Sequence, residues 1–179
     1  MNNFKNFDIC LEEPCLENYS DPPEDPLKEL SEFEMGIRKF CFDCNRQVSI
    51  EIGDERLRVF LDPDICMLLE DRLPEQIGEL SQGKSIEIEF TESCWLIIKL
   101  VPLADKISCT LKEFGYSSTK KHFDLDKAQA VEVLRRFLNE LIQLAVEQGY
   151  ITQEDKEQFL SPASPAEAQP TGVPQGSGV

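Results

Sequence analysis

Cys41 and Cys44 form a CxxC pair, the spacing with which thiolates bind zinc or exchange disulfides. A structural zinc site normally takes four nitrogen or sulfur ligands from two such pairs. The sequence contains no second CxxC, although Cys10 and Cys15 could supply two further thiolates. A redox-active pair is expected at the start of a helix, whose dipole stabilises the thiolate, whereas strand or loop is predicted here. A metal- or redox-linked regulator is therefore an alternative hypothesis, and ordinary thiols are the expectation.

The residues that could support catalysis are few. His122 is the single histidine, and the sequence contains no nucleophile elbow and no phosphate- or dinucleotide-binding motif. Asp62 and Asp64 flank Pro63, and the start of a helix explains them better than a general acid and base. We therefore expect a non-enzymatic protein without a cofactor. An enzyme without a recognisable motif is a further alternative.

The charge balance narrows the class of partners. The 179 residues have a formal net charge of −16, which argues against nucleic acid and against anionic membranes. The first ten residues lack the pattern of a signal peptide, and no stretch is long and apolar enough to cross a bilayer. Seven scattered cysteines indicate reduced thiols. We expect a cytoplasmic protein with a protein partner, and the acidity permits a basic one.

Composition divides the chain into three parts. Residues 1–34 are acidic and proline-rich, and we expect them to be loosely ordered. Residues 35–160 carry regular apolar patterns and are predicted to form a single α+β domain. Residues 161–179 are rich in Pro, Gly and Ser, and we expect a disordered tail.

The order of periodic segments predicts the architecture. Residues 37–42 suggest a short strand, 48–61 a β-hairpin, 63–80 helical pieces and 86–111 a three-strand meander, before a long C-terminal helix. This order predicts an α+β fold. Specifically, we expect a two-layer sandwich in which the helices cover one face of a mainly antiparallel sheet.

The segment 124–148 is the most clearly helical stretch, with no internal Gly or Pro. Its polar residues occupy one narrow sector, so the helix is predicted to pack on two sides. Val133, Phe137 and Leu144 lie on its second apolar edge. This edge packs either on another helix of the chain or on a second copy in a homodimer.

The outer face of the predicted sheet carries residue types that anchor interfaces. Trp95 and Ile97 point away from the helices if Leu96 points toward them, and Arg56, Arg58 and Phe60 share that face in the predicted phasing. Another element of the chain could instead cover this surface. The favoured hypothesis is an acidic protein-interaction module, such as an inhibitor, adaptor or chaperone-like accessory, that binds through this outer sheet face.

Overall fold

The computed structural model describes residues 4–115 and 118–165, and it confirms an α+β fold with antiparallel sheets. In chain order the elements are β1 (Phe7–Pro14), α1 (Glu32–Cys44), β2 (Arg46–Ile52), β3 (Glu55–Phe60), α2 (Cys66–Glu70), α3 (Leu73–Ser81), β4 (Ile86–Phe90), β5 (Leu96–Leu103), β6 (Lys106–Glu113), β7 (Lys120–Asp126), α4 (Lys127–Glu147) and α5 (Gln153–Leu160). A π-helical turn, Leu61–Ile65, precedes α2, and a 3-10 turn, Ser161–Ala163, follows α5.

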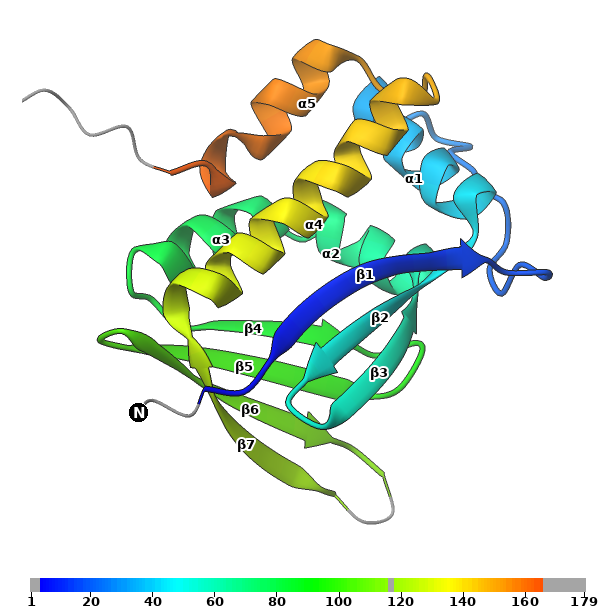
Figure 1. Ribbon diagram of the computed structural model, residues 1–179. Coiled ribbons are helices and arrows are strands. Elements are labelled where there is room, and N and C mark those ends of the chain that lie inside the picture. The colour runs from blue at the N-terminus through cyan, green and yellow to red at the C-terminus, as the bar shows by residue number, and fades with distance from the viewer. Residues whose placement is uncertain (1–3, 116–117, 166–179) are drawn as a thin grey trace, which may run out of the picture.

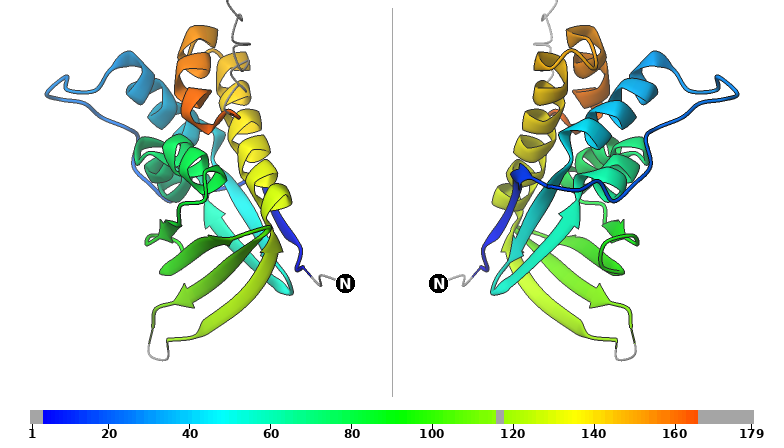
Figure 2. Two further views of the ribbon diagram at one scale, coloured as in Figure 1. Left: turned by 90° about the vertical axis from the view of Figure 1, so that its left-hand side faces the viewer. Right: turned by 90° about the vertical axis from the view of Figure 1, so that its right-hand side faces the viewer.

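The strands form two sheets, with orders β1-β2-β3 and β4-β5-β6-β7. The second sheet extends the expected three-strand meander by β7. The backbone N–H of Lys5 donates to the carbonyl of Asp124 at 2.9 Å and so links the chain before β1 to β7. Figures 1 and 2 show the helices on one side of the four-stranded sheet, while no described element covers its opposite face. We call that face the outer face.

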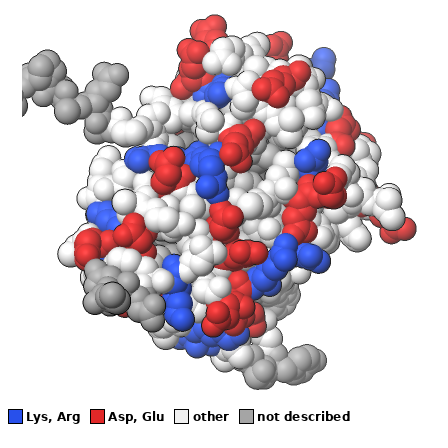
Figure 3. All heavy atoms as spheres, in the orientation of Figure 1, with Lys and Arg blue, Asp and Glu red and all other residues white. Residues whose placement is uncertain are grey.

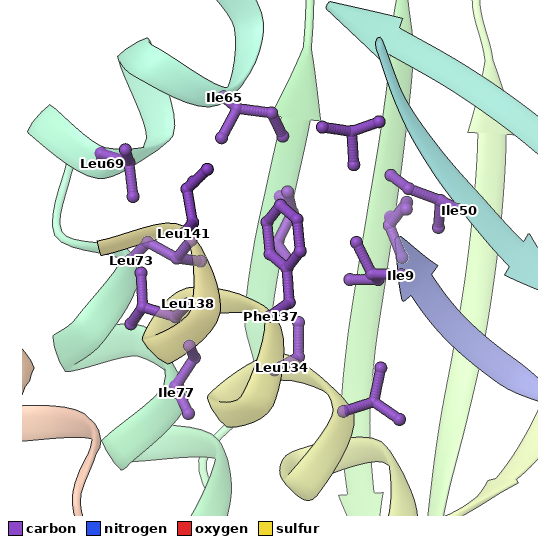
Figure 4. Packing of buried hydrophobic residues seen from close by; sticks show 14 of the residues in the cluster. Ile9, Ile50, Ile65, Leu69, Leu73, Ile77, Leu134, Phe137, Leu138 and Leu141 are labelled. Carbon is purple, nitrogen blue, oxygen red and sulfur yellow. The ribbon is translucent and has the colours of Figure 1, made fainter. Parts of the chain in front are cut away.

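The long helix α4 is the centre of the core. It contacts β1, the four-stranded sheet, α3 and α5, which confirms the expected packing on two sides. Asp126, rather than the expected Asp124, caps it by accepting from the N–H of Gln129, because β7 continues through Asp126. Figure 4 shows Leu138 and Leu141 directed toward α2 and α3, and Phe137 beside Ile9 of the small sheet, with Ile50 beyond Ile9.

The N-terminal segment contributes a strand that we did not predict. Phe7 and Ile9 are 2% and 7% exposed, and they alternate with the outward-facing Asp8 and Cys10. β1 pairs antiparallel with β2, with Ile9 opposite Ile50. Part of the segment expected to be loose is therefore core. The domain boundaries at residues 34 and 160 stay a prediction, and residues 166–179 lie outside the described residues.

Residues 37–42 are helical, so the predicted short strand is wrong. The helix α1 starts at a capping box in which Ser31 and Glu34 satisfy each other's backbone N–H groups. Its buried residues include Ile37, Phe40 and Cys41, whose spacing of three and four places them on one helical face. The strand prediction relied on Phe42, which is half-buried.

Gly36 allows α1 to approach the backbone that follows α4. A Cβ atom at this position would lie 2.3 Å from the carbonyl oxygen of Tyr150. We expect Gly36→Ala to lower the free energy of unfolding by about 1–3 kcal/mol, as overpacking does, despite a gain of about 1 kcal/mol in helix propensity. Urea denaturation would measure it.

Gly115→Ala is the matched control, because a Cβ there meets nothing within 4 Å. It should change the free energy of unfolding by less than about 0.5 kcal/mol. Equal midpoints for Gly36→Ala and the wild-type protein would show that α1 can move away from Tyr150 at no cost.

Candidate functional site

An exposed aromatic hollow lies on the outer face of the four-stranded sheet, near the turn between β4 and β5. Trp95 is 65% exposed and Phe114 is 40% exposed, whereas most large apolar side chains of the protein are buried. The hollow has a volume of about 580 Å³. It is lined by Glu89, Thr91, Glu92, Trp95, Leu96, Ile97 and Phe114. We call this set the aromatic hollow.

Neighbouring strands place these side chains together. Ile97 of β5 lies opposite Glu89 of β4 and Lys112 of β6. Phe114 follows β6, and its backbone N–H donates to the carbonyl of Trp95 at 2.9 Å. The strand alternation directs Leu96 and Ile98 inward, so Ile97 faces outward as the sequence predicted.

Trp95 adopts a backbone conformation that is costly for its residue type. Its φ is +45°, in the left-handed region that glycine adopts freely and a bulky side chain adopts only when its surroundings require it. The buried Asp64 holds the turn that precedes Trp95 in place. Holding Trp95 in this conformation, with its indole exposed, therefore lowers the free energy of unfolding of the protein.

Asp64 holds this turn through two hydrogen bonds. Its carboxylate accepts from the backbone N–H of Glu92 at 3.2 Å and from the hydroxyl of Ser93. The hydroxyl oxygen of Ser93 in turn accepts from the backbone N–H of Phe60 at 3.0 Å, which ties β3 to the same turn. Asp64 is only 2% exposed. Burial raises the pKa of its carboxyl group, while hydrogen bonds with the backbone of Glu92, Ser93 and Phe60 act in the opposite direction. Asp64 lies in the first turn of the helical segment that begins at Leu61, as the sequence suggested, and it also positions this turn.

The electrostatic surroundings of the hollow are negative. Burial, together with the charges of Asp64 and Glu113, raises the pKa of the Cys94 thiol to about 11. Within residues 4–115 and 118–165, neither Glu89 nor Glu92 has an ion-pair partner. One cation is already near, because Lys112 Nζ lies 4.4 Å from the centroid of the Phe114 ring.

The structure separates the five residues that the sequence grouped into one surface. Trp95 and Ile97 line the hollow, whereas Arg56, Arg58 and Phe60 lie on β3 of the other sheet. The grouping assumed one continuous sheet. The link between the two sets is the hydrogen bond from Phe60 to the turn before Trp95.

The β3 residues have partners within the chain. Glu12 of β1 pairs with Arg56 at 3.0 Å and with Arg58 at 3.3 Å. Phe60 stacks on Tyr19, with ring centroids 4.4 Å apart. Figure 3 shows acidic and basic side chains interspersed over the face that carries β1 and α4. The N-terminal segment thus contributes partners to the β3 part of the predicted surface, although Arg56 and Arg58 stay exposed.

The sequence reasoning missed four members of the hollow: Glu89, Thr91, Glu92 and Phe114. The strand that ends at Glu113 carries Lys112 on its outer face, so Phe114 falls on the same face by alternation. Glu89 alternates with the buried Ile88 and Phe90. These signals were available, but the pairing of strands that brings them beside Trp95 was not.

The CxxC pair lies where a thiolate is disfavoured. Cys41 and Cys44 lie in the last turn of α1, where the helix dipole disfavours a thiolate. A hydrogen bond with Cys66 and complete burial raise the pKa of Cys41 well above its ordinary value, and burial raises that of Cys44. In the part of the chain that the structure describes, no group of three or more His, Cys, Asp or Glu side chains could hold a metal ion.

The second edge of α4 packs inside this chain. Val133 and Phe137 are each 4% exposed, and Leu144 is half-buried against the core. Val133 and Phe137 thus pack within the chain, and the homodimer stays a prediction.

Comparison with protein-family models, with curated proteins and with solved structures found no match to this chain. Among the described residues, no helix is long and apolar enough to span a bilayer.

Proposed function

We propose that this protein is a non-enzymatic protein-interaction module that binds its partner through the aromatic hollow. The observation that carries the proposal is the presentation of Trp95, which is largely exposed, has a costly backbone conformation and follows a turn held by a buried carboxylate. Tryptophan dominates many protein interfaces because it buries a large apolar area when it is covered. An inhibitor, an adaptor and a chaperone-like accessory all use a surface of this kind.

The chemistry of the hollow favours binding over catalysis. Its lining combines aromatic and apolar side chains with two carboxylates. The nearby Cys94 thiol has a pKa of about 11 and is protonated at neutral pH. His122 contacts Thr110, with 3.1 Å between Nδ1 and Oγ1, and does not line the hollow. These groups can hold a partner, and they do not form a nucleophile with an adjacent base.

Two further properties agree with an intracellular binding protein. All seven cysteines are free thiols, which suits the reducing cytoplasm. The net charge of −16 favours association with a basic or mixed-charge partner.

The experiment is affinity capture from a lysate with the tagged protein and with a Trp95→Ala, Phe114→Ala variant. A partner that the wild-type protein retains should be lost, because removing interface anchors costs about 2 kcal/mol or more each, roughly a 30-fold loss of affinity. Mass spectrometry would identify the partner and quantify its loss.

Leu103→Ala is the matched control, since Leu103 is also an exposed apolar residue of β5, 48% exposed, and does not line the hollow. It should retain the partner. Equal capture by the double variant and the wild-type protein, with equal urea midpoints, would show that the hollow is not the binding site.

A further inference from the structure

We infer that the aromatic hollow recognises an arginine side chain carried by an exposed segment of the partner protein. This inference deepens the proposed function and rests on it. Its basis is the combination of a free indole face with two carboxylates that have no ion-pair partner among the described residues. Together these groups match the planar, charged guanidinium.

The two carboxylates are placed to act in the same hollow as Trp95. Glu89 projects to the outer face of β4 opposite Ile97, and Glu92 lies in the turn held by Asp64. Glu87, two residues before Glu89 on the same face, is paired with Lys99 at 2.9 Å. The sheet therefore satisfies one carboxylate of this row and leaves the next one for a partner.

The contact between Lys112 and Phe114 shows that this part of the surface accommodates a cation over an aromatic ring. The lysine lies over the Phe114 ring, at 4.4 Å from its centroid. Trp95 offers the stronger cation–π face, and arginine is the cation most often found there. A lysine would gain the charge attraction, but it would lose the stacking and the two-pronged hydrogen bonding of guanidinium to carboxylate.

The size of the hollow agrees with a side chain and part of its backbone. About 580 Å³ lies within the usual range of ligand sites, about 300–1,000 Å³. The outward-facing Ile97 gives the hollow an apolar side chain, so the aliphatic stem of an arginine can pack on it while the charged end reaches Glu89 or Glu92.

The test uses the single tryptophan of the chain as the reporter, because all tryptophan fluorescence comes from the hollow. A blocked Gly-Arg-Gly peptide is titrated at low salt, and a Gly-citrulline-Gly peptide serves as the neutral isostere. We expect the arginine peptide to change the Trp95 fluorescence saturably and to bind at least about fivefold more tightly than the citrulline peptide.

Four variants test the charges. Glu89→Gln and Glu92→Gln should each lower the affinity for the arginine peptide by up to about fivefold. Glu87→Gln should leave the affinity unchanged, because Glu87 is already paired and lies outside the hollow. Lys112→Met should strengthen binding by about twofold, since it removes a like charge. All four variants should have nearly the urea midpoint of the wild-type protein, because surface substitutions usually change the free energy of unfolding very little.

The outcomes separate this inference from the proposed function. Equal affinity for both peptides, binding of neither, or no effect of Glu89→Gln and Glu92→Gln would overturn arginine recognition. In each case a captured partner that Trp95→Ala loses would still support the interaction module. Self-association abolished by Trp95→Ala would make a second copy the occupant and would also overturn the inference.

Discussion

Phe137→Ala is expected to lower the free energy of unfolding by about 3–5 kcal/mol, which is the usual cost of truncating a buried phenylalanine. The side chain is 4% exposed and lies beside Ile9 of the small sheet (Figure 4), and it lines the same small cavity as Ile9 and Ile50. Its loss would leave a cavity where three elements meet. Because domains are stable by only about 5–15 kcal/mol, urea denaturation should show a large shift of the midpoint.

Leu144→Ala is the control for this prediction. Leu144 lies on the same helix two turns later and is half-buried, so less apolar area is lost and the residual cavity opens to solvent. Its effect should be less than half that of Phe137→Ala. A Phe137→Ala variant as stable as Leu144→Ala would contradict the central position of Phe137 in the core.

Asp64→Ala is expected to lower the free energy of unfolding by about 2–3 kcal/mol. The substitution removes a charged acceptor and leaves the N–H of Glu92 and the hydroxyl of Ser93 without it. The turn before Trp95 should loosen, so amide hydrogen exchange at residues 92–95 should accelerate. Asp62→Ala is the control, because Asp62 is more exposed and accepts from Ser20 instead. Unchanged exchange rates at residues 92–95 in Asp64→Ala would show that the turn keeps its structure without the Asp64 carboxylate.

The ionisation of Asp64 adds a pH dependence to this prediction. Burial raises the pKa of its carboxyl group in the folded protein above the ordinary value of 3.8. The folded state therefore binds this proton more tightly than the unfolded state does. The resulting stabilisation is fully present below pH 3.8, and it is lost as the pH rises through the raised pKa.

The Asp64→Asn variant isolates this effect, because an amide does not titrate. Its free energy of unfolding relative to the wild-type protein should become more favourable as the pH rises from below 3.8 to neutral. Urea titrations of both proteins across this range would measure the difference, to which Asp62 contributes equally in both. A difference that stays constant with pH would show that Asp64 has the same pKa in the folded and unfolded states.

Local patterns were sufficient where the sequence neighbours decide the structure. The run from 127 to 147 is helical because its propensities and apolar spacing agree, and its narrow polar sector correctly indicated two packing partners. The β2–β3 hairpin also followed from alternation, with Glu51 opposite Arg56 as the short turn implied. The same local reading failed at residues 37–42, where the capping box at Ser31 and the helical spacing of Ile37, Phe40 and Cys41 favour a helix.

By itself, the sequence determined the fold class, the long helix, the hairpin and the outward direction of Trp95 and Ile97. Only the tertiary structure decided that Phe7–Pro14 enters a sheet with a strand more than thirty residues later, that the strands form two sheets, and that Phe114 and Glu89 join Trp95 in one hollow. The physical reason is the distance along the sequence between the residues that interact. Helix periodicity and short turns are encoded within a few residues, whereas strand partners and the contact of Asp64 with Ser93 depend on how distant segments share one core.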